Sequence, residues 1–162
     1  MIRVICCLIL FPVLLPAQTA ATDSVARRIE RLSATLRFSP GIGDTLAVIS
    51  SRLHFRADTM IMEHEIMEEG RAVYRTRVFI PADKINEVKL SSHVIRPGAP
   101  ERLHSYVVSS KDYHRAFRSE TMEAPAPEYT HVASFNTSLD EELPKLRQLA
   151  ELTKKWVELL KH

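Results

Sequence analysis

Cysteine and glycine are both scarce in this chain, and each shortage argues against a class of protein. The 162 residues include two cysteines, Cys6 and Cys7, and four glycines. Both cysteines lie in an N-terminal apolar segment that we expect to be removed, which leaves a chain without thiols. We therefore expect no disulfide framework, no thiolate nucleophile and no cysteine zinc site. The sequence also has no G-x-S-x-G nucleophile turn, and the G-x-G at 39–45 lacks the third glycine of a nucleotide-binding loop.

An excess of charge of one sign is missing as well. Lysine and arginine number 22 against 20 aspartates and glutamates, for a formal net charge of +2. A nucleic-acid-binding domain usually carries a strongly basic stripe, so we expect no nucleic-acid partner. Charged residues make up 26% and hydrophobic residues 45%, which is typical of a globular domain. About 140 residues are enough to bury a core without disulfides.

The apolar run at residues 4–15 is too short to cross a bilayer, which takes roughly 20 residues. It follows Arg3 and precedes several small residues, which is the layout of a secretory signal peptide. We predict a signal peptide at residues 1–20 and a single domain at 22–162. Cleavage is expected at one of three positions, after Ala17, Ala20 or Ala21. The protein is then exported, periplasmic or secreted, with no transmembrane segment after cleavage.

Residues 23–38 are predicted to form an amphipathic helix. The apolar positions recur at steps of four, three and four, which places them on one face: Val25, Ile29, Leu32 and Leu36. Proline and glycine at 39–43 end this helix. The next segment, residues 44–53, suits either a short helix or a strand.

Residues 60–66 and 74–80 are predicted to pair as a β-hairpin, because apolar and polar residues alternate in both. A three-residue loop at 68–70 would place Gly70 in the left-handed region, where glycine costs least. This register keeps the apolar residues on one face and the glutamates and arginines on the other. The expected pairs are Met60–Val78, Met62–Thr76, His64–Tyr74 and Glu63–Arg75.

His64 and Glu65 begin a near-match to the zinc-protease motif H-E-x-x-H, with Glu68 in place of the second histidine. A helix there would run into Gly70 and would leave the alternation after it unexplained. We therefore interpret His64 as a histidine at the edge of the core, with a hydrogen-bond partner, and expect no metal site in this segment.

Further strands are predicted at 85–95, 102–109 and 128–136, whereas 111–122 is helix or strand. The last of these strands is expected to place Tyr129, His131, Ala133 and Phe135 on one face. Ser138 and Glu141 form a capping-box pattern ahead of a regular helix from Pro144, with an irregular turn at 138–143. One half of this helix is apolar, as one-sided coverage of a sheet requires.

These elements predict an α+β domain. It has an N-terminal helix, an antiparallel meander of four to five strands and a long C-terminal helix. Both helices pack on one face of the sheet. The other face carries the glutamates and arginines, which we expect to neutralise one another on a solvated surface.

The seven histidines suggest one candidate metal site. If residues 96–101 form the hairpin loop, Ile95 pairs with Arg102 and His93 lies opposite His104, where two imidazoles could bind zinc or copper. No third ligand is defined by the sequence, so we expect a cross-strand pair without a metal. Serines, histidines and aspartates are present, which leaves a Ser/His/Asp triad open.

The expected function is a small exported binding or interaction module without catalysis or cofactor, acting on a protein or small-molecule partner. The open sheet face and residues 96–127 are its expected working surfaces, since loops are longest there. The alternative is a metal-dependent or hydrolytic enzyme that uses His93, His104 or His114. Convergence of three histidines with a carboxylate would favour the enzyme.

Overall fold

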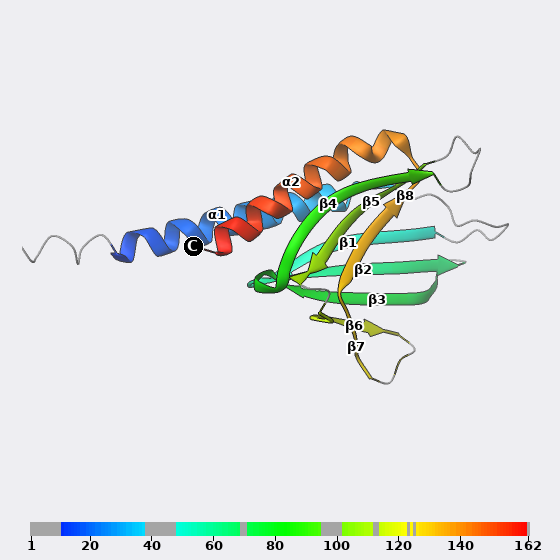
Figure 1. Ribbon diagram of the computed structural model, residues 1–162, viewed down its shortest axis with the longest axis horizontal. Helices are drawn as coiled ribbons and strands as arrows, with labels where there is room; N and C mark the ends of the chain where they lie inside the picture. The colour runs from blue at the N-terminus through cyan, green and yellow to red at the C-terminus, as the bar shows by residue number, and fades with distance from the viewer. Residues whose placement is uncertain are drawn as a thin grey trace, which may run out of the picture.

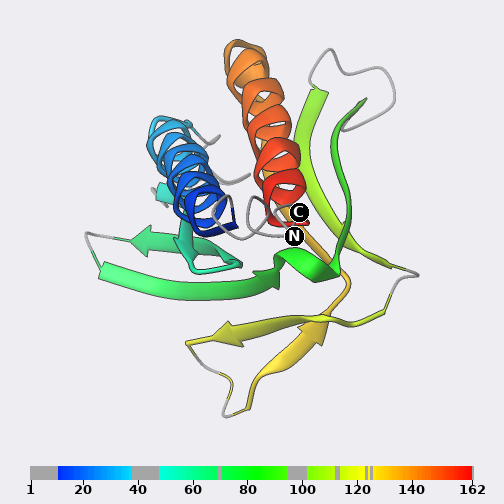
Figure 2. The same ribbon diagram turned by 90° about the vertical axis from the view of Figure 1, so that its left-hand side faces the viewer.

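A computed structural model describes residues 11–37, 48–68, 71–94, 102–111, 114–122, 124 and 126–161. Two helices and eight antiparallel strands make up the folded part of these residues (Figure 1). The helices lie together on the inner side of two sheets, which curve around them (Figure 2). The α+β class, the antiparallel strands and the two terminal helices are as predicted.

The strands form two sheets where the sequence indicated one. The larger has the order β1-β2-β3-β6-β7 and the smaller the order β4-β5-β8. The first comprises β1 (Val48–Arg56), β2 (Thr59–Glu68), β3 (Arg71–Pro81), β6 (Phe117–Thr121) and β7 (Glu128–Thr130). The second comprises β4 (Ile85–Val94), β5 (Arg102–Ser110) and β8 (Val132–Thr137). Residues 48–53, left open by the sequence, are strand, and 117–121 supply the short strand β6.

The chain passes between the sheets at corners. The 3-10 turn η1 (Ala82–Lys84) joins β3 to β4, and His131 separates β7 from β8. This second corner explains a wrong prediction. Ala133 is buried, whereas Tyr129 is 54% exposed, so the expected common face does not continue through His131.

Helix α1 (Phe11–Ser33) begins well before residue 23, where the sequence predicted it to start. It therefore overlaps the second half of the predicted signal peptide. In the part of the chain that the structure describes, no helix is both long and apolar enough to cross a membrane.

Helix α2 (Leu143–Leu160) follows the 3-10 turn η3 (Asp140–Glu142), close to the predicted turn and start. The predicted capping box does not start this helix. Its N-cap is Glu142, which makes no side-chain capping bond, and Pro144 lies in its first turn. Glu141 instead pairs with Arg37 at 2.6 Å.

The β2–β3 hairpin has the predicted faces with a register shifted by two residues. Met62 pairs with Val78 and His64 with Thr76, and a bulge lies between Ile66 and Met67. A shift of two preserves the faces because side chains alternate with a period of two. Glu68 pairs with Arg71, so the expected three-residue loop is wrong; residues 69–70 themselves lie outside the described residues. The strand also excludes the helix that a zinc-protease motif needs.

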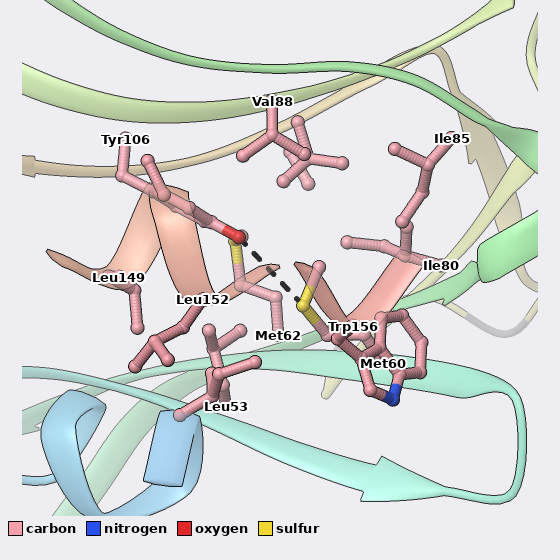
Figure 3. Packing of buried hydrophobic residues seen from close by; sticks show 14 of the residues in the cluster. Leu53, Met60, Met62, Ile80, Ile85, Val88, Tyr106, Leu149, Leu152 and Trp156 are labelled. Carbon is pink, nitrogen blue, oxygen red and sulfur yellow. Dashed lines mark hydrogen bonds between the residues drawn. The ribbon is translucent and has the colours of Figure 1, made fainter. Parts of the chain in front are cut away.

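The core fills the space between α2 and both sheets. Met60 and Met62 of β2, Tyr106 of β5 and Trp156 of α2 are fully buried. The Tyr106 hydroxyl points toward the Met60 sulfur, 3.9 Å away (Figure 3). It also donates a 2.9 Å hydrogen bond to the Thr153 hydroxyl. The Trp156 ring packs edge-on against Phe55 of β1, with 4.7 Å between centroids.

Side chains of α1 cover the outer edge of β1. The backbone N–H of Leu53 donates to the Ser33 hydroxyl at 3.0 Å, and that of Phe55 donates to the Glu30 carboxylate at 3.0 Å. Both amides lie on an edge strand, where they would otherwise lack a partner. A helix side chain thus replaces the missing neighbouring strand at two positions.

Ser33→Ala should destabilise the fold, because it leaves the buried Leu53 amide without an acceptor. The expected loss is about 1–3 kcal/mol in the free energy of unfolding, measured by urea denaturation. Ser24→Ala, at an exposed position of α1, is the matched control and should change little. Equal unfolding midpoints for the two variants would contradict the edge-capping role.

Candidate functional site

A row of polar residues faces inward near one end of the five-stranded sheet. Ser51, His64 and Thr76 are cross-strand neighbours on β1, β2 and β3. The Ser51 hydroxyl lies 2.7 Å from Nδ1 of His64, and the His64 ring packs edge-on against Phe135 at 5.6 Å between centroids. Burial lowers the pKa of His64 below its ordinary value, so the ring is neutral at neutral pH. His64 is therefore the hydrogen-bonded histidine that the sequence predicted, with a partner on β1.

The three-stranded sheet has a similar row. Ser92 on β4 pairs with His104 on β5, which pairs with Thr137 on β8. The Ser92 hydroxyl lies 2.7 Å from Nδ1 of His104. His104 is 2% exposed, whereas Ser92 is exposed. This serine is accessible from outside while its histidine partner is not.

Asp140 extends this second pair to a chain of three, which we call the Ser–His–Asp chain. Its Oδ1 lies 2.7 Å from Nε2 of His104. An ionised carboxylate only accepts hydrogen bonds, so Nε2 carries the ring proton and Nδ1 accepts from the Ser92 hydroxyl. The Asp140 side chain is 82% exposed, so water screens its charge. Its main effect is to hold the imidazole in one orientation and one tautomer.

Buried charge anchors the turn that carries Asp140. The Glu142 side chain is excluded from solvent and accepts hydrogen bonds from Arg37 at 2.9 Å and Lys145 at 3.1 Å. Burial acts to raise the pKa of Glu142, but the bonds from Lys145 and Arg37 outweigh it, and this pKa lies below its usual value. On the other side, the backbone N–H of Leu139 donates to the Thr137 hydroxyl at 3.2 Å.

The predicted pairing of His93 with His104 is wrong by one residue. Val94, and not Ile95, pairs with Arg102, so His93 lies opposite Leu103 and faces the other side of the sheet. Ser92 takes the place that His93 was expected to fill. His114 lies beyond β5, and its backbone carbonyl accepts a hydrogen bond from the Ser110 hydroxyl. Among the described residues, no three histidines, cysteines or carboxylates gather in a group that could hold a metal ion.

A hollow of about 410 Å³ lies where the two helices meet the β1–β2 turn. Gln18 and Thr22 of α1, Leu159 of α2 and Ala57 of the turn are among its lining residues. The Gln18 side chain donates a 2.8 Å hydrogen bond to the Leu159 carbonyl. Cleavage after Ala20 or Ala21 would remove Gln18, whereas cleavage after Ala17 would retain it.

The outer face of the five-stranded sheet carries the predicted glutamate–arginine ladder, in the corrected register. Arg75 pairs with Glu65 and Arg77 with Glu63, each at 2.5 Å. A hollow of about 210 Å³ lies beside this ladder, lined by Arg75, Arg77, Glu120, Thr121 and Met122. Segment 96–127 thus contributes β6 and Met122 to the open sheet face, so the two expected working surfaces adjoin.

Sequence reasoning missed Ser92 and Asp140 as partners of His104. Ser92 lies within the strand predicted at 85–95, but the predicted β4–β5 register placed His93, and not Ser92, opposite His104. No local signal relates Asp140 to His104, since the two are 36 residues apart and meet only through the turn before α2.

His64 should make the fold sensitive to mild acid. Its lowered pKa means that the unfolded chain takes up the proton first as the pH falls below about 6.5, so stability declines from there toward the folded-state pKa. The slope from one such group is at most about 1.4 kcal/mol per pH unit. His64→Gln should flatten the curve of unfolding free energy against pH, whereas His54→Gln, at an exposed position, should not. Parallel curves for the two variants would refute this role of His64.

Comparison of the chain with family models, with curated proteins and with solved structures found no match. Two places in the described residues have geometry that suits a function. One is the outer face of β3 and β6, and the other is the Ser–His–Asp chain.

Proposed function

We propose that the protein is a small exported binding module that holds a partner protein against the outer face of β3, β6 and β7. The observation that carries this proposal is the hollow lined by Arg75, Arg77 and Met122, where two ion-paired arginines adjoin the exposed Met122 side chain. Export is proposed from the signal-peptide layout of the N-terminal segment.

Exposed apolar residues lie at this hollow and elsewhere on β3 and β7. Met122 is 60% exposed, Tyr129 54% and Val73 40%. Tyr129 pairs with Arg118, whose guanidinium lies 4.4 Å above the Phe79 ring. Tyrosine, methionine and arginine are the residue types enriched in the cores of protein interfaces, where they bury large contact area.

The arginines at this face are already held in place. Arg75 and Arg77 keep side-chain exposures of 41% and 46% while each bonds a glutamate of β2. A guanidinium has five donors, more than one carboxylate can accept, so each can bond a partner as well. Because their rotamers are set before binding, less side-chain entropy is lost in the complex.

The fold leaves this face uncovered by helices. Helices α1 and α2 lie on the opposite side of the five-stranded sheet, and the β6–β7 pair extends away from them (Figure 2). A partner can therefore approach without displacing either helix. The chemistry of the face suits a protein surface that combines acidic and apolar side chains.

Site-specific photo-cross-linking tests this proposal. A benzophenone amino acid at Val73, an exposed residue of β3 two positions before Arg75, should give a discrete cross-linked protein adduct in the cells that naturally produce the protein. The same probe at Lys154, on the exposed side of α2, should not. Adding Met122→Ser to the Val73 probe should lower the yield about tenfold, as the loss of about 1.4 kcal/mol of binding energy predicts. Equal yields at both positions, or no effect of Met122→Ser, would overturn the proposal.

The second function expected from the sequence, a histidine-based hydrolytic enzyme, draws support from a different part of the molecule. That part is the Ser–His–Asp chain of the three-stranded sheet.

A further inference from the structure

We infer that Ser92 is a nucleophile that cleaves short-chain carboxylic esters, with His104 as its general base and Asp140 as the residue that positions the base. This activity goes beyond the proposed binding function and uses none of its residues. The three side chains come from β4, β5 and η3, and they meet in the order that nucleophilic catalysis by serine requires.

The two hydrogen bonds define the direction of proton movement. Ser92 Oγ and His104 Nδ1 are 2.7 Å apart, and His104 Nε2 and Asp140 Oδ1 are 2.7 Å apart. Because the carboxylate retains the proton on Nε2, Nδ1 has a free electron pair toward the serine hydroxyl. The ring nitrogens exchange places relative to the chymotrypsin arrangement, but the roles are the same, and such triads are recognised by geometry and roles.

The proposed nucleophile is exposed to solvent, whereas its general base is buried. Ser92 is exposed on β4, an edge strand of its sheet, so a substrate can reach its oxygen. His104 is 2% exposed, which protects the base from competing hydrogen bonds with water. Val94, two residues along β4 on the same face, is 48% exposed and offers apolar surface to a short acyl group. These features favour small esters that present an accessible carbonyl.

The reaction balances with water as the only co-reactant. The Ser92 oxygen attacks the ester carbonyl carbon, and its proton moves to Nδ1 of His104. The C–O bond to the alcohol breaks, and the alcohol leaves with that proton, which gives an acyl-serine. Water then attacks the acyl-serine through the same base, which releases the carboxylic acid and restores Ser92.

The chain contains its own comparison site. Ser51 and His64 form an equally short pair, also 2.7 Å, on the five-stranded sheet. Ser51, however, is 4% exposed and no described carboxylate contacts His64. Substituting Ser51 removes a serine–histidine hydrogen bond from the inner face of a sheet without touching the proposed nucleophile.

Covalent labelling with a fluorophosphonate, followed by peptide mass spectrometry, tests the assignment on the full chain. The native protein should be labelled on Ser92 and should release nitrophenolate from p-nitrophenyl acetate with an initial burst. Ser92→Ala should abolish both the label and the burst, and Ser51→Ala should leave both unchanged.

Because the Asp140 side chain is exposed, substitutions at this position are expected to leave the fold intact. Asp140→Asn should slow labelling at least tenfold with an unchanged melting temperature, and Asp140→Glu should restore part of the rate, because it returns a carboxylate to Nε2. Labelling of the native chain at another residue, or none at all, would disprove the inference. So would equal rates for the native, Asp140→Asn and Ser51→Ala proteins.

Discussion

The contact of α2 with both sheets is the constraint on which the rest of the structure depends. Thr153, in the middle of this helix, accepts a hydrogen bond from Tyr106 of the three-stranded sheet, and Trp156 packs on Phe55 of the five-stranded sheet. Burial raises the pKa of the Tyr106 hydroxyl, which therefore stays protonated and remains a donor. One helix thus determines how far apart the inner faces lie. Burial of apolar side chains supplies most of the driving force for folding. The Tyr106–Thr153 hydrogen bond gives the two hydroxyls inside this core a partner.

The geometry of the Ser–His–Asp chain also depends on the contact of α2 with the sheets. Asp140 and Glu142 belong to the turn that leads directly into α2, so the docking of this helix brings a carboxylate to His104. Arg37 connects that turn to the segment after α1. The outer face of β3 and β6 depends on α2 much less, since its ion pairs form between adjacent strands. The two proposed activities are therefore physically separable within one fold.

Local patterns predicted most of the elements. The amphipathic stripe of α2 and the alternation in β2 and β3 each identify one buried face, and in both cases that face is buried. The register of the β2–β3 hairpin was harder to predict. The observed hairpin, with a bulge at Ile66 and Met67, places His64 opposite Thr76, and it turns the same faces inward as the predicted register does. The one-residue error in the β4–β5 pair mattered more, since it exchanged His93 for Ser92. Division into two sheets depends on corners such as His131, which carry no periodic signal.

The cover that Ser33 and Glu30 provide for the edge of β1 has a consequence for the nascent chain. An uncovered edge strand is a template for pairing with other molecules, and β1 would be the longest strand at an edge of its sheet. Helix α1 precedes β1 in the sequence, so the ribosome synthesises the covering helix before the edge strand. Intermolecular β-pairing at this edge is thereby disfavoured as soon as the helix docks.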